Sequence, residues 1–295
     1  MSTRIRIAVC TNRAPEAVAE ALAAVAAEAP DAPRALVTSG LSGAAIAAHA
    51  AAAPGWEVLS EPRPGLSLAR NRALAWAAVD DDVLAFVDDD AVVDPGWHAA
   101  LVRRWDEVPA TVACVGGPIR PRFAVAAPRW VGPGILPALT LLDRGPEVRD
   151  LDPAREEAVY GANISFRAGP LRAAGGFDPA WGHSGGRVYF AEEDEAQRAL
   201  GRLGYTTRYV PDAGVLHVIP AERLTRASFL RRRYAFGKAL GARGGRPRGL
   251  AARQVATAVA GTLVAAAQRD DRKLMERAVR AAENLGALTA RSTRA

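Results

Sequence analysis

The stretch VLAFVDDDAVVDPGW, residues 83–97, runs five apolar residues into three aspartates and then into a Pro-Gly turn. An uninterrupted apolar run of this length, bounded by turn residues, is typical of a strand buried on both faces of a sheet. The three adjacent carboxylates repel one another unless positive charge lies among them. Because ligands bind at the carboxyl ends of strands in open α/β sheets, we expect a divalent cation at residues 88–90.

The segments around this strand alternate between strand and helix patterns. Short apolar runs predict further strands at 4–10, 34–39 and 56–60. Helical patterns follow these strands at 11–30, 42–55 and 61–79. The alternation predicts a largely parallel sheet with right-handed crossovers. Farther along the chain we expect strands at 111–119, 158–167 and 206–218, a helix at 192–204 with Ala196, Leu200 and Leu203 on one face, and a long loop at 120–157.

The composition is that of an ordinary globular protein, with 49% hydrophobic and 24% charged residues among 295. Only Cys10 and Cys114 are present, so we expect no disulfide framework and a cytoplasmic location. The N-terminal apolar stretch is too short for a signal peptide, and the apolar run at 255–267 is too short to span a bilayer. The net charge of +6 suits an anionic partner, which includes nucleotide diphosphates, nucleic acid and lipid surfaces.

A second aspartate triplet, residues 80–82, serves as an internal control. It precedes the strand, in the turn that follows a helix, where solvated acidic residues are common. We therefore expect residues 80–82 to be a solvated turn, and only residues 88–90 to bind a ligand. A second acidic cluster, EEDE at 192–195, begins a predicted helix, where the helix dipole favours negative charge.

Seven short motifs occur in an order and spacing that resemble the family 2 glycosyltransferases: VCTNR, PGLSLARNRAL, FVDDD, YGANISFR, GGFDP, EEDEAQRAL and VLHV. The resemblance covers residues 4–240. It implies a GT-A fold, which is a doubly wound mixed, mostly parallel α/β sheet flanked by helices. It also implies a transferase domain at 1–222, with a nucleotide-binding half at 1–110 and an acceptor half at 111–222. Residues 223–295 would then form a basic helical C-terminal extension.

The resemblance further implies a metal-dependent inverting transfer of sugar from a nucleotide-sugar donor to an acceptor hydroxyl. Asp194 would be the general base and Glu193 would contact acceptor or donor sugar. Asp90 and His217 would bind Mn²⁺ or Mg²⁺, while Asp89 would only shape the turn. The residues implied in donor binding are Thr11, Asn12, Arg13, Arg70, Asn71, Asp88 and Asn163.

One departure from the family pattern concerns the nucleotide base. The family usually carries an aspartate after the second strand, whereas this chain has VTSGLSG at 37–43. We therefore expect the base to be contacted by Thr11, Ser39 or backbone groups. In the loop at 181–190, Trp181 or Tyr189 would stack on a sugar or pack in the protein.

The acceptor stays open among a small molecule, a glycan and a lipid-linked compound. Peripheral membrane contact and a homodimer also stay open. Residues 250–295 are expected to pack as helices through Val255, Val259 and Leu263, on the core or on a second copy.

Two other functions fit parts of the sequence. A sugar-nucleotide nucleotidyltransferase would share a similar sheet, but CTNRAPEA after the first strand lacks the glycines that cradle phosphate. A nucleic-acid-binding protein would explain the pI of about 9.9 and the basic stretch after residue 226. Neither carboxylate cluster would be needed for nucleic-acid binding, so we expect no nucleic acid partner.

Overall fold

The computed structural model describes residues 3–77, 80, 82–155, 157–180, 183–184, 187–188, 192–242 and 247–290. The chain forms two compact units. The first comprises Met1–Arg122, Thr140–Gly185 and Ala191–Val218. The second comprises Phe123–Leu139, Gly186–Phe190 and Ile219–Ala295.

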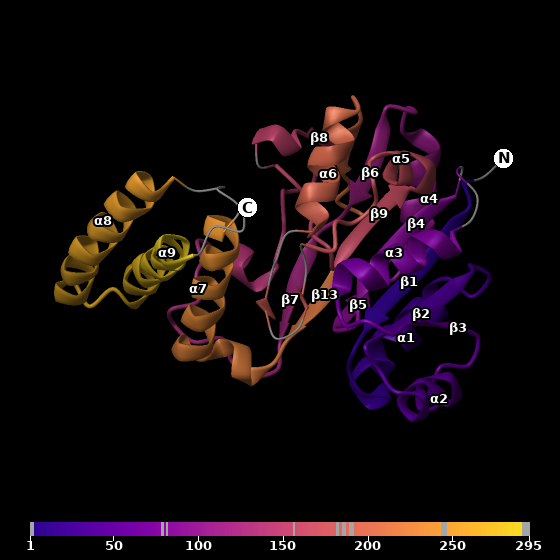
Figure 1. Cartoon of the computed structure of the whole chain (residues 1–295), viewed down its shortest axis with the longest axis horizontal. Helices are drawn as coiled ribbons and strands as arrows, with labels where there is room; N and C mark the ends of the chain where they lie inside the picture. Colours follow the sequence, from indigo (N-terminus) through magenta and orange to yellow (C-terminus); the bar gives the residue numbers. More distant parts are fainter. Residues whose placement is uncertain are drawn as a thin grey trace. The chain divides into compact units, whose positions relative to one another are not determined.

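An eight-stranded sheet forms the centre of the first unit (Figure 1). Its order is β3 (Glu57–Glu61), β2 (Arg34–Ser39), β1 (Ile5–Thr11), β4 (Val83–Asp88), β9 (Asn163–Arg167), β6 (Val112–Gly116), β12 (Thr206–Tyr209) and β8 (Arg149–Leu151). The first four strands are parallel, and β12 is parallel to β6. Strand β9 runs antiparallel to both β4 and β6, and β8 runs antiparallel to β12. The predicted mixed, mostly parallel sheet is thereby confirmed.

Helices flank this sheet: α1 (Pro15–Glu28), α2 (Gly43–Ala52), α3 (Leu66–Trp76), α4 (Trp97–Glu107), α5 (Ala168–Ala173) and α6 (Glu192–Arg202). In α1, the apolar residues Val18, Leu22 and Val25 lie at helical spacing on one face and are buried. In α6, Ala196 and Leu200 are buried, but Leu203 lies beyond the end of the helix and is 51% exposed. The predicted third position of that stripe was therefore wrong.

A smaller sheet lies beside the end of β4. Its strands are β5 (Ala91–Val93), β13 (Val215–Ile219) and β7 (Ile119–Phe123), in that order. Strand β13 runs antiparallel to β5 and pairs His217 with Ala91. The predicted strand at 206–218 is therefore two strands in two sheets, and the strand at 111–119 is likewise two, β6 and β7.

The expected loop at 120–157 contains short regular elements: the end of β7, η1 (Leu136–Leu139), β8 and η2 (Pro153–Arg155). The loop at 181–190 contains the short strands β10 (His183–Ser184) and β11 (Arg187–Val188). Trp181 and Tyr189, which were predicted to stack or pack, lie outside the described residues.

The second unit is helical, with η3 (Ala221–Leu224), α7 (Arg226–Ala242), α8 (Arg248–Ala267) and α9 (Asp271–Thr289). Helix α9 packs against both α7 and α8. Glycines permit the close approach of α7 and α9, since a Cβ on Gly286 would lie 2.1 Å from the carbonyl oxygen of Tyr234. None of the helices in the described part of the chain is long and apolar enough to cross a membrane.

The residues that α8 buries differ from the expected ones. Buried positions recur every seven residues, at Ala251, Ala258 and Ala265, whereas Val259 is 52% exposed. The prediction that the larger apolar residues of α8 pack inward is therefore wrong for Val259. Small residues are buried instead because they let α8 lie close to α9.

Candidate active site

The triplet Asp88–Asp90 lies where β4 ends, beside the end of its parallel neighbour β1. The Thr11 hydroxyl, at the end of β1, donates a hydrogen bond to Asp89. The Arg13 Nη1 atom lies 3.4 Å from Asp89 Oδ1 and 3.8 Å from Asp90 Oδ2. Asp89 therefore does more than shape a turn, because its carboxylate ties the two strand ends together. These contacts bring Thr11 and Arg13 to the acidic triplet, whereas Asn12 is exposed to solvent.

Asp90 and His217 are neighbours, as a shared part in metal binding would require. The His217 Nε2 atom lies 3.1 Å from Asp90 Oδ1, and the histidine is 2% exposed. The backbone fixes this pair, because the amide of Val218 donates to the carbonyl oxygen of Asp90 over 2.9 Å. A carboxylate oxygen and an imidazole nitrogen are both suitable ligands for Mn²⁺, so the donor chemistry fits a divalent cation.

The protein alone does not supply a full ligand set in the described residues. No group of three or more His, Cys, Asp or Glu side chains among them has an arrangement that could hold a metal ion. Mg²⁺ is usually bound by only one or two carboxylates together with substrate phosphates. The Asp90–His217 pair therefore fits a cation that is completed by a bound diphosphate.

The carboxyl group of Asp88 is a weaker acid than usual. Burial raises the pKa of its carboxyl to about 6, the Arg70 charge opposes this, and the Asp90 charge adds to it. Burial also raises the pKa of Asp89, against the hydrogen bond from Thr11. Burial is the largest cause of both shifts, and the Asp90 charge adds to each of them.

Arg70 lies at the centre of the site and is 2% exposed. Its Nη1 atom donates to Glu192 Oε1 over 2.9 Å, and its Nη2 atom lies 3.5 Å from Asp88 Oδ1. The guanidinium also lies 5.6 Å from the ring centroids of Phe86 and Phe177. This buried arginine connects the two acidic clusters from below the surface, and its predicted part in donor binding stays a prediction.

Gly161 makes room for this arginine. A Cβ atom at Gly161 would lie 2.3 Å from Arg70 Nη2, so a larger residue would displace the guanidinium. The Gly161 amide also donates to Glu193 Oε1 over 3.1 Å, and Glu193 Oε2 lies 3.7 Å from Arg70 Nη1. Helix α6 is thereby anchored with its first turn directed at the end of β4.

Glu192 is the residue that the sequence analysis missed. It is 3% exposed, and burial raises its pKa to about 8, with the Glu193 charge adding to the shift and Arg70 opposing it. A usable signal was present, because Glu192 is four residues before Ala196 and so shares the buried face of α6. Asp194, the predicted base, is half-buried in the same first turn.

Two predicted donor-binding amides have other partners. Asn71 donates to the carbonyl oxygen of Phe177 over 2.6 Å and accepts from its amide over 2.8 Å. Asn163 is 3% exposed, accepts from Trp97 Nε1 over 3.1 Å and donates to the carbonyl oxygen of Ala213 over 2.7 Å. Both side chains hold loops in place, and their contact with the donor stays a prediction.

The residues expected to replace the missing base-reading aspartate are also engaged. The Ser39 hydroxyl accepts from the amide of Gly65 over 3.0 Å, and Ser39 is 6% exposed. Thr11 is bound to Asp89, as described above. Both hydroxyls thus have partners within the protein, and contact of the base with Thr11, Ser39 or backbone groups stays a prediction.

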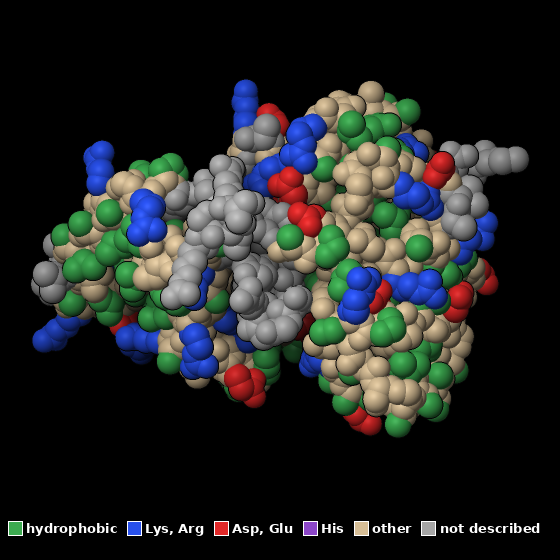
Figure 2. All heavy atoms as spheres, in the orientation of Figure 1, with side chains coloured by type: hydrophobic (Ala, Val, Ile, Leu, Met, Phe, Trp, Pro, Cys, Tyr) green, Lys and Arg blue, Asp and Glu red, His purple; other side chains and the backbone are tan. Residues whose placement is uncertain are grey.

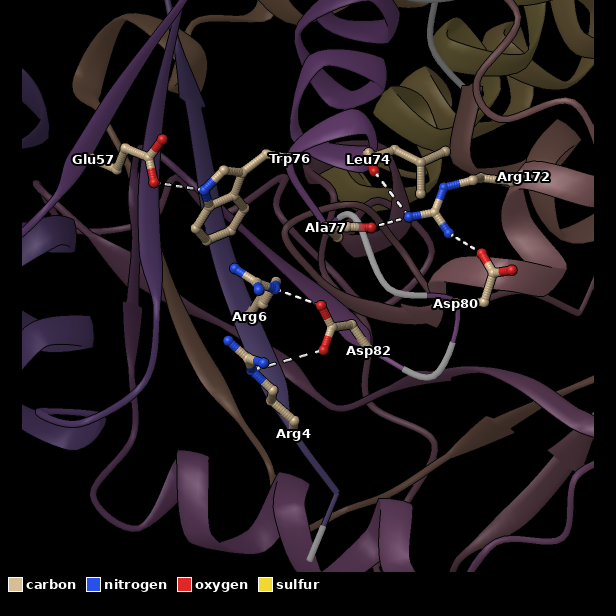
Figure 3. A network of polar contacts seen from close by, with 9 residues as sticks. All are labelled: Arg4, Arg6, Glu57, Leu74, Trp76, Ala77, Asp80, Asp82 and Arg172. Carbon is tan, nitrogen blue, oxygen red and sulfur yellow. Dashed lines mark hydrogen bonds and ion pairs between the residues drawn. The ribbon is translucent and has the colours of Figure 1, made fainter.

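The other triplet proves to be an ion-paired turn (Figure 3). Asp82 is 2% exposed, and its Oδ2 lies 2.5 Å from Arg6 Nε. Asp80 is exposed and accepts from Arg172, whose other nitrogen donates to carbonyl oxygens at the end of α3. The predicted solvated turn is thus correct for Asp80 and wrong for Asp82. Asp81 lies outside the described residues.

The comparisons with known proteins concern mainly the N-terminal half of the chain. The profile described as "Glycosyl transferase family 2" matches residues 7–129. The "Glucosyl-dolichyl phosphate glucuronosyltransferase" of Haloferax volcanii is 32% identical over 117 residues, which are 38% of this chain and 34% of the relative. The "Succinoglycan biosynthesis protein ExoM" of Rhizobium meliloti is 29% identical over 181 residues, which are 61% and 53% of the two chains. The chain thus spans between a third and about half of these relatives.

Solved structures share the fold over a longer stretch. The mannosyltransferase PcManGT from Pyrobaculum calidifontis, in complex with GDP-Man and Mn²⁺, has a TM-score of 0.58 at 18% identity and covers 97% of this chain and 87% of its own. GalNAc-T7 with UDP, GalNAc and Mn²⁺ has a TM-score of 0.56 at 15% identity and covers 82% and 48%. Both are GT-A transferases, which confirms the expected fold class. Residues 7–129 of this chain thus match the family 2 glycosyltransferases in sequence, and the chain has a GT-A fold.

Proposed function

We propose that this chain is a metal-dependent inverting glycosyltransferase, which moves a sugar from a nucleotide-sugar donor to an acceptor hydroxyl. One observation carries the proposal. Arg70 joins Asp88 at the end of β4 to Glu192 and Glu193 at the start of α6, within the first unit. The acidic carboxyl end of β4, which suits a cation with a bound diphosphate, is thereby coupled to the acidic first turn of α6, which suits a general base.

Each acidic cluster has a separate part in the proposed reaction. Asp90 and His217 would hold the cation, and Asp88 would lie beside the donor. When bound, the cation would supply positive charge to the leaving diphosphate. Asp194 would accept the proton of the acceptor hydroxyl as that oxygen attacks the anomeric carbon, and Glu193 would contact the sugar. A single displacement of this kind inverts the configuration of the anomeric carbon.

The names of the similar proteins suggest the chemical class of the donor and the acceptor. GDP-Man and UDP are named with the two solved structures, and a dolichyl phosphate is named with one relative. We infer a nucleoside diphosphate sugar as donor, and a glycan or a lipid-linked sugar as acceptor. The cytoplasmic location stays a prediction from the cysteine content.

The proposed base is tested by Asp194→Asn. This change removes the proton acceptor but keeps the size of the side chain, so turnover should fall roughly 10²–10⁴-fold with donor affinity little changed. Glu195→Gln is the matched control, because Glu195 stands next in the same acidic run and pairs with Arg202 on the surface. It should retain turnover.

Donors are first identified by thermal shift with UDP-, GDP- and dTDP-sugars, each with and without Mn²⁺. The anomeric configuration of the product is then read by NMR and should be opposite to that of the donor. Retained configuration, or normal turnover in the Asp194→Asn enzyme, would refute the mechanism.

A further inference from the structure

The charge of this chain is divided very unevenly along its length. Residues 219–295 contain 17 Lys or Arg and 5 Asp or Glu, a net charge of +12. Residues 1–218 contain 21 Lys or Arg and 27 Asp or Glu, a net charge of −6. The total of +6 therefore conceals an acidic transferase unit and a strongly basic helical one. Such a concentration of one sign predicts an anionic partner for the helical unit.

The basic side chains of this unit are exposed on all three long helices. They are Arg226, Arg231, Lys238, Arg248, Arg253, Arg272, Lys273 and Arg280, with Arg269 in the turn before α9. Three of the five acidic residues pair within the unit: Asp271 with Arg226, Glu283 with Arg233 and Asp270 with Lys273. The remaining basic residues greatly outnumber the acidic ones, so the positive charge is not cancelled internally.

Helix α8 adds an apolar surface to this charge. Its buried alanines lie toward α9, yet the opposite side is apolar as well, with Ala252, Ala256, Val259 and Ala260 exposed on one face. Val259 is 52% exposed. Figure 2 shows hydrophobic side chains gathered over α8, with Lys and Arg side chains around them. A helix that is apolar on its outer side as well as its inner side is expected to be covered.

We propose that the outer face of α8, with the basic side chains beside it, docks on an anionic lipid surface. Lasting peripheral attachment needs two signals, and a basic patch together with an apolar face supplies both. A second copy of the chain would bring the same basic side chains to this face, so like charges oppose self-association there. Nucleic acid would neutralise the charge but would gain nothing from contact with the exposed Val259. This inference does not depend on the proposed transferase activity.

The test is sedimentation of the full chain with phosphatidylcholine vesicles that contain about one third phosphatidylglycerol. The chain should bind these vesicles at least 10-fold more tightly than pure phosphatidylcholine vesicles. Binding should weaken between about 0.1 M and about 1 M salt, because the Debye length falls from about 10 Å to about 3 Å.

Two variants separate the charged and apolar contributions. Arg248→Glu with Arg253→Glu should lower vesicle binding roughly 25-fold or more, at about fivefold for each basic residue lost near the surface. Val259→Ser should lower it roughly 10-fold, because the side chain no longer gains from leaving water. The matched controls lie in the first unit: Leu203→Ser, with 51% exposure, and Arg155→Glu, with 82% side-chain exposure. Both should bind like the parent.

Circular dichroism confirms that each variant keeps its helices. Equal binding to both kinds of vesicle, or unchanged binding by the double charge variant, would overturn the proposal. So would a concentration-dependent dimer that Val259→Ser dissociates, or duplex DNA binding that matches vesicle binding and ignores Val259→Ser.

Discussion

The two aspartate triplets stand at opposite ends of the same strand, β4, and have opposite charge surroundings. At the amino end, Asp80 and Asp82 face three arginines: Arg4, Arg6 and Arg172. At the carboxyl end, in the contacts of the described residues, five carboxylates share Arg13 and Arg70. They are Asp88, Asp89, Asp90, Glu192 and Glu193. Identical sequence therefore forms an ion-paired turn at one end and an undercompensated acidic edge at the other.

The neighbouring strand decides this difference. Strand β1 runs parallel to β4 and brings Arg4 and Arg6 to the amino end and Thr11 to the carboxyl end. Arg6 is held further by Trp76, whose ring centroid lies 5.0 Å from the guanidinium carbon. The excess of carboxylates over arginines at the carboxyl end would favour the cation that we propose there.

The largest expected effect comes from Asp90→Asn. This change removes one of the two proposed protein ligands of the cation, so Mn²⁺-dependent donor binding should be lost and kcat/KM should fall more than roughly 100-fold. Loss of residues that merely support metal ligands already costs about 10–100-fold. The fold should be unaffected, because Asp90 lies just beyond the carboxyl end of β4.

Calorimetric titration of Mn²⁺ and donor measures this loss, and removal of metal by a chelator should reproduce it in the parent. Asp82→Asn is the comparison variant at the other end of β4 and should keep kcat/KM. If Asp90→Asn binds metal and donor normally, the two triplets do not differ in function.

Asp82→Asn should instead lower the free energy of unfolding by about 2 kcal/mol. Breaking a buried ion pair costs about 3–5 kcal/mol when the other charge stays buried. Arg6 keeps some side-chain exposure, at 14%, and its position over Trp76, so we expect a smaller loss. Urea denaturation measures the change. Asp80→Asn is the matched control, and since its side chain is 78% exposed it should cost less than about 1 kcal/mol.

Equal losses for Asp80→Asn and Asp82→Asn would show that burial does not distinguish these aspartates. The amino-end turn would then be the solvated one that its position in the sequence predicts.

The sequence predicted the sheet and the site edge because both follow from local patterns. Alternating strand and helix segments predict the parallel sheet. The position of Asp90 directly after an apolar run predicts that it lies at the carboxyl end of a strand, where ligands bind in such sheets. Asp82 was misjudged because its partner comes from β1, although the alternation in RIRI could have placed Arg4 and Arg6 on one side of that strand.

The predicted donor contacts of Arg70, Asn71 and Asn163 stay predictions, because the structure shows these side chains with other partners. Their partners are distant in sequence, since Asn71 binds Phe177 and Asn163 binds Ala213. A motif identifies a residue near the site, but only the fold determines whether its polar atoms point to the ligand or to another loop. The sequence motif around Arg70 is the same whether the arginine is buried among carboxylates or exposed to a ligand.

The smallest expected effect concerns pH and Glu192. Burial raises the pKa of this carboxyl from 4.5 to about 8. The folded chain therefore holds the proton more tightly than the unfolded chain, so the stabilisation is complete below pH 4.5 and is lost as pH rises toward 8. Glu192→Gln keeps an acceptor for Arg70 but cannot titrate. The melting temperature of the parent should thus fall more than that of the variant between pH 5 and pH 8. Glu195→Gln removes an acid from the same helix and should follow the parent. Parallel curves for the parent and Glu192→Gln would show that burial does not raise the pKa of Glu192 in the folded chain.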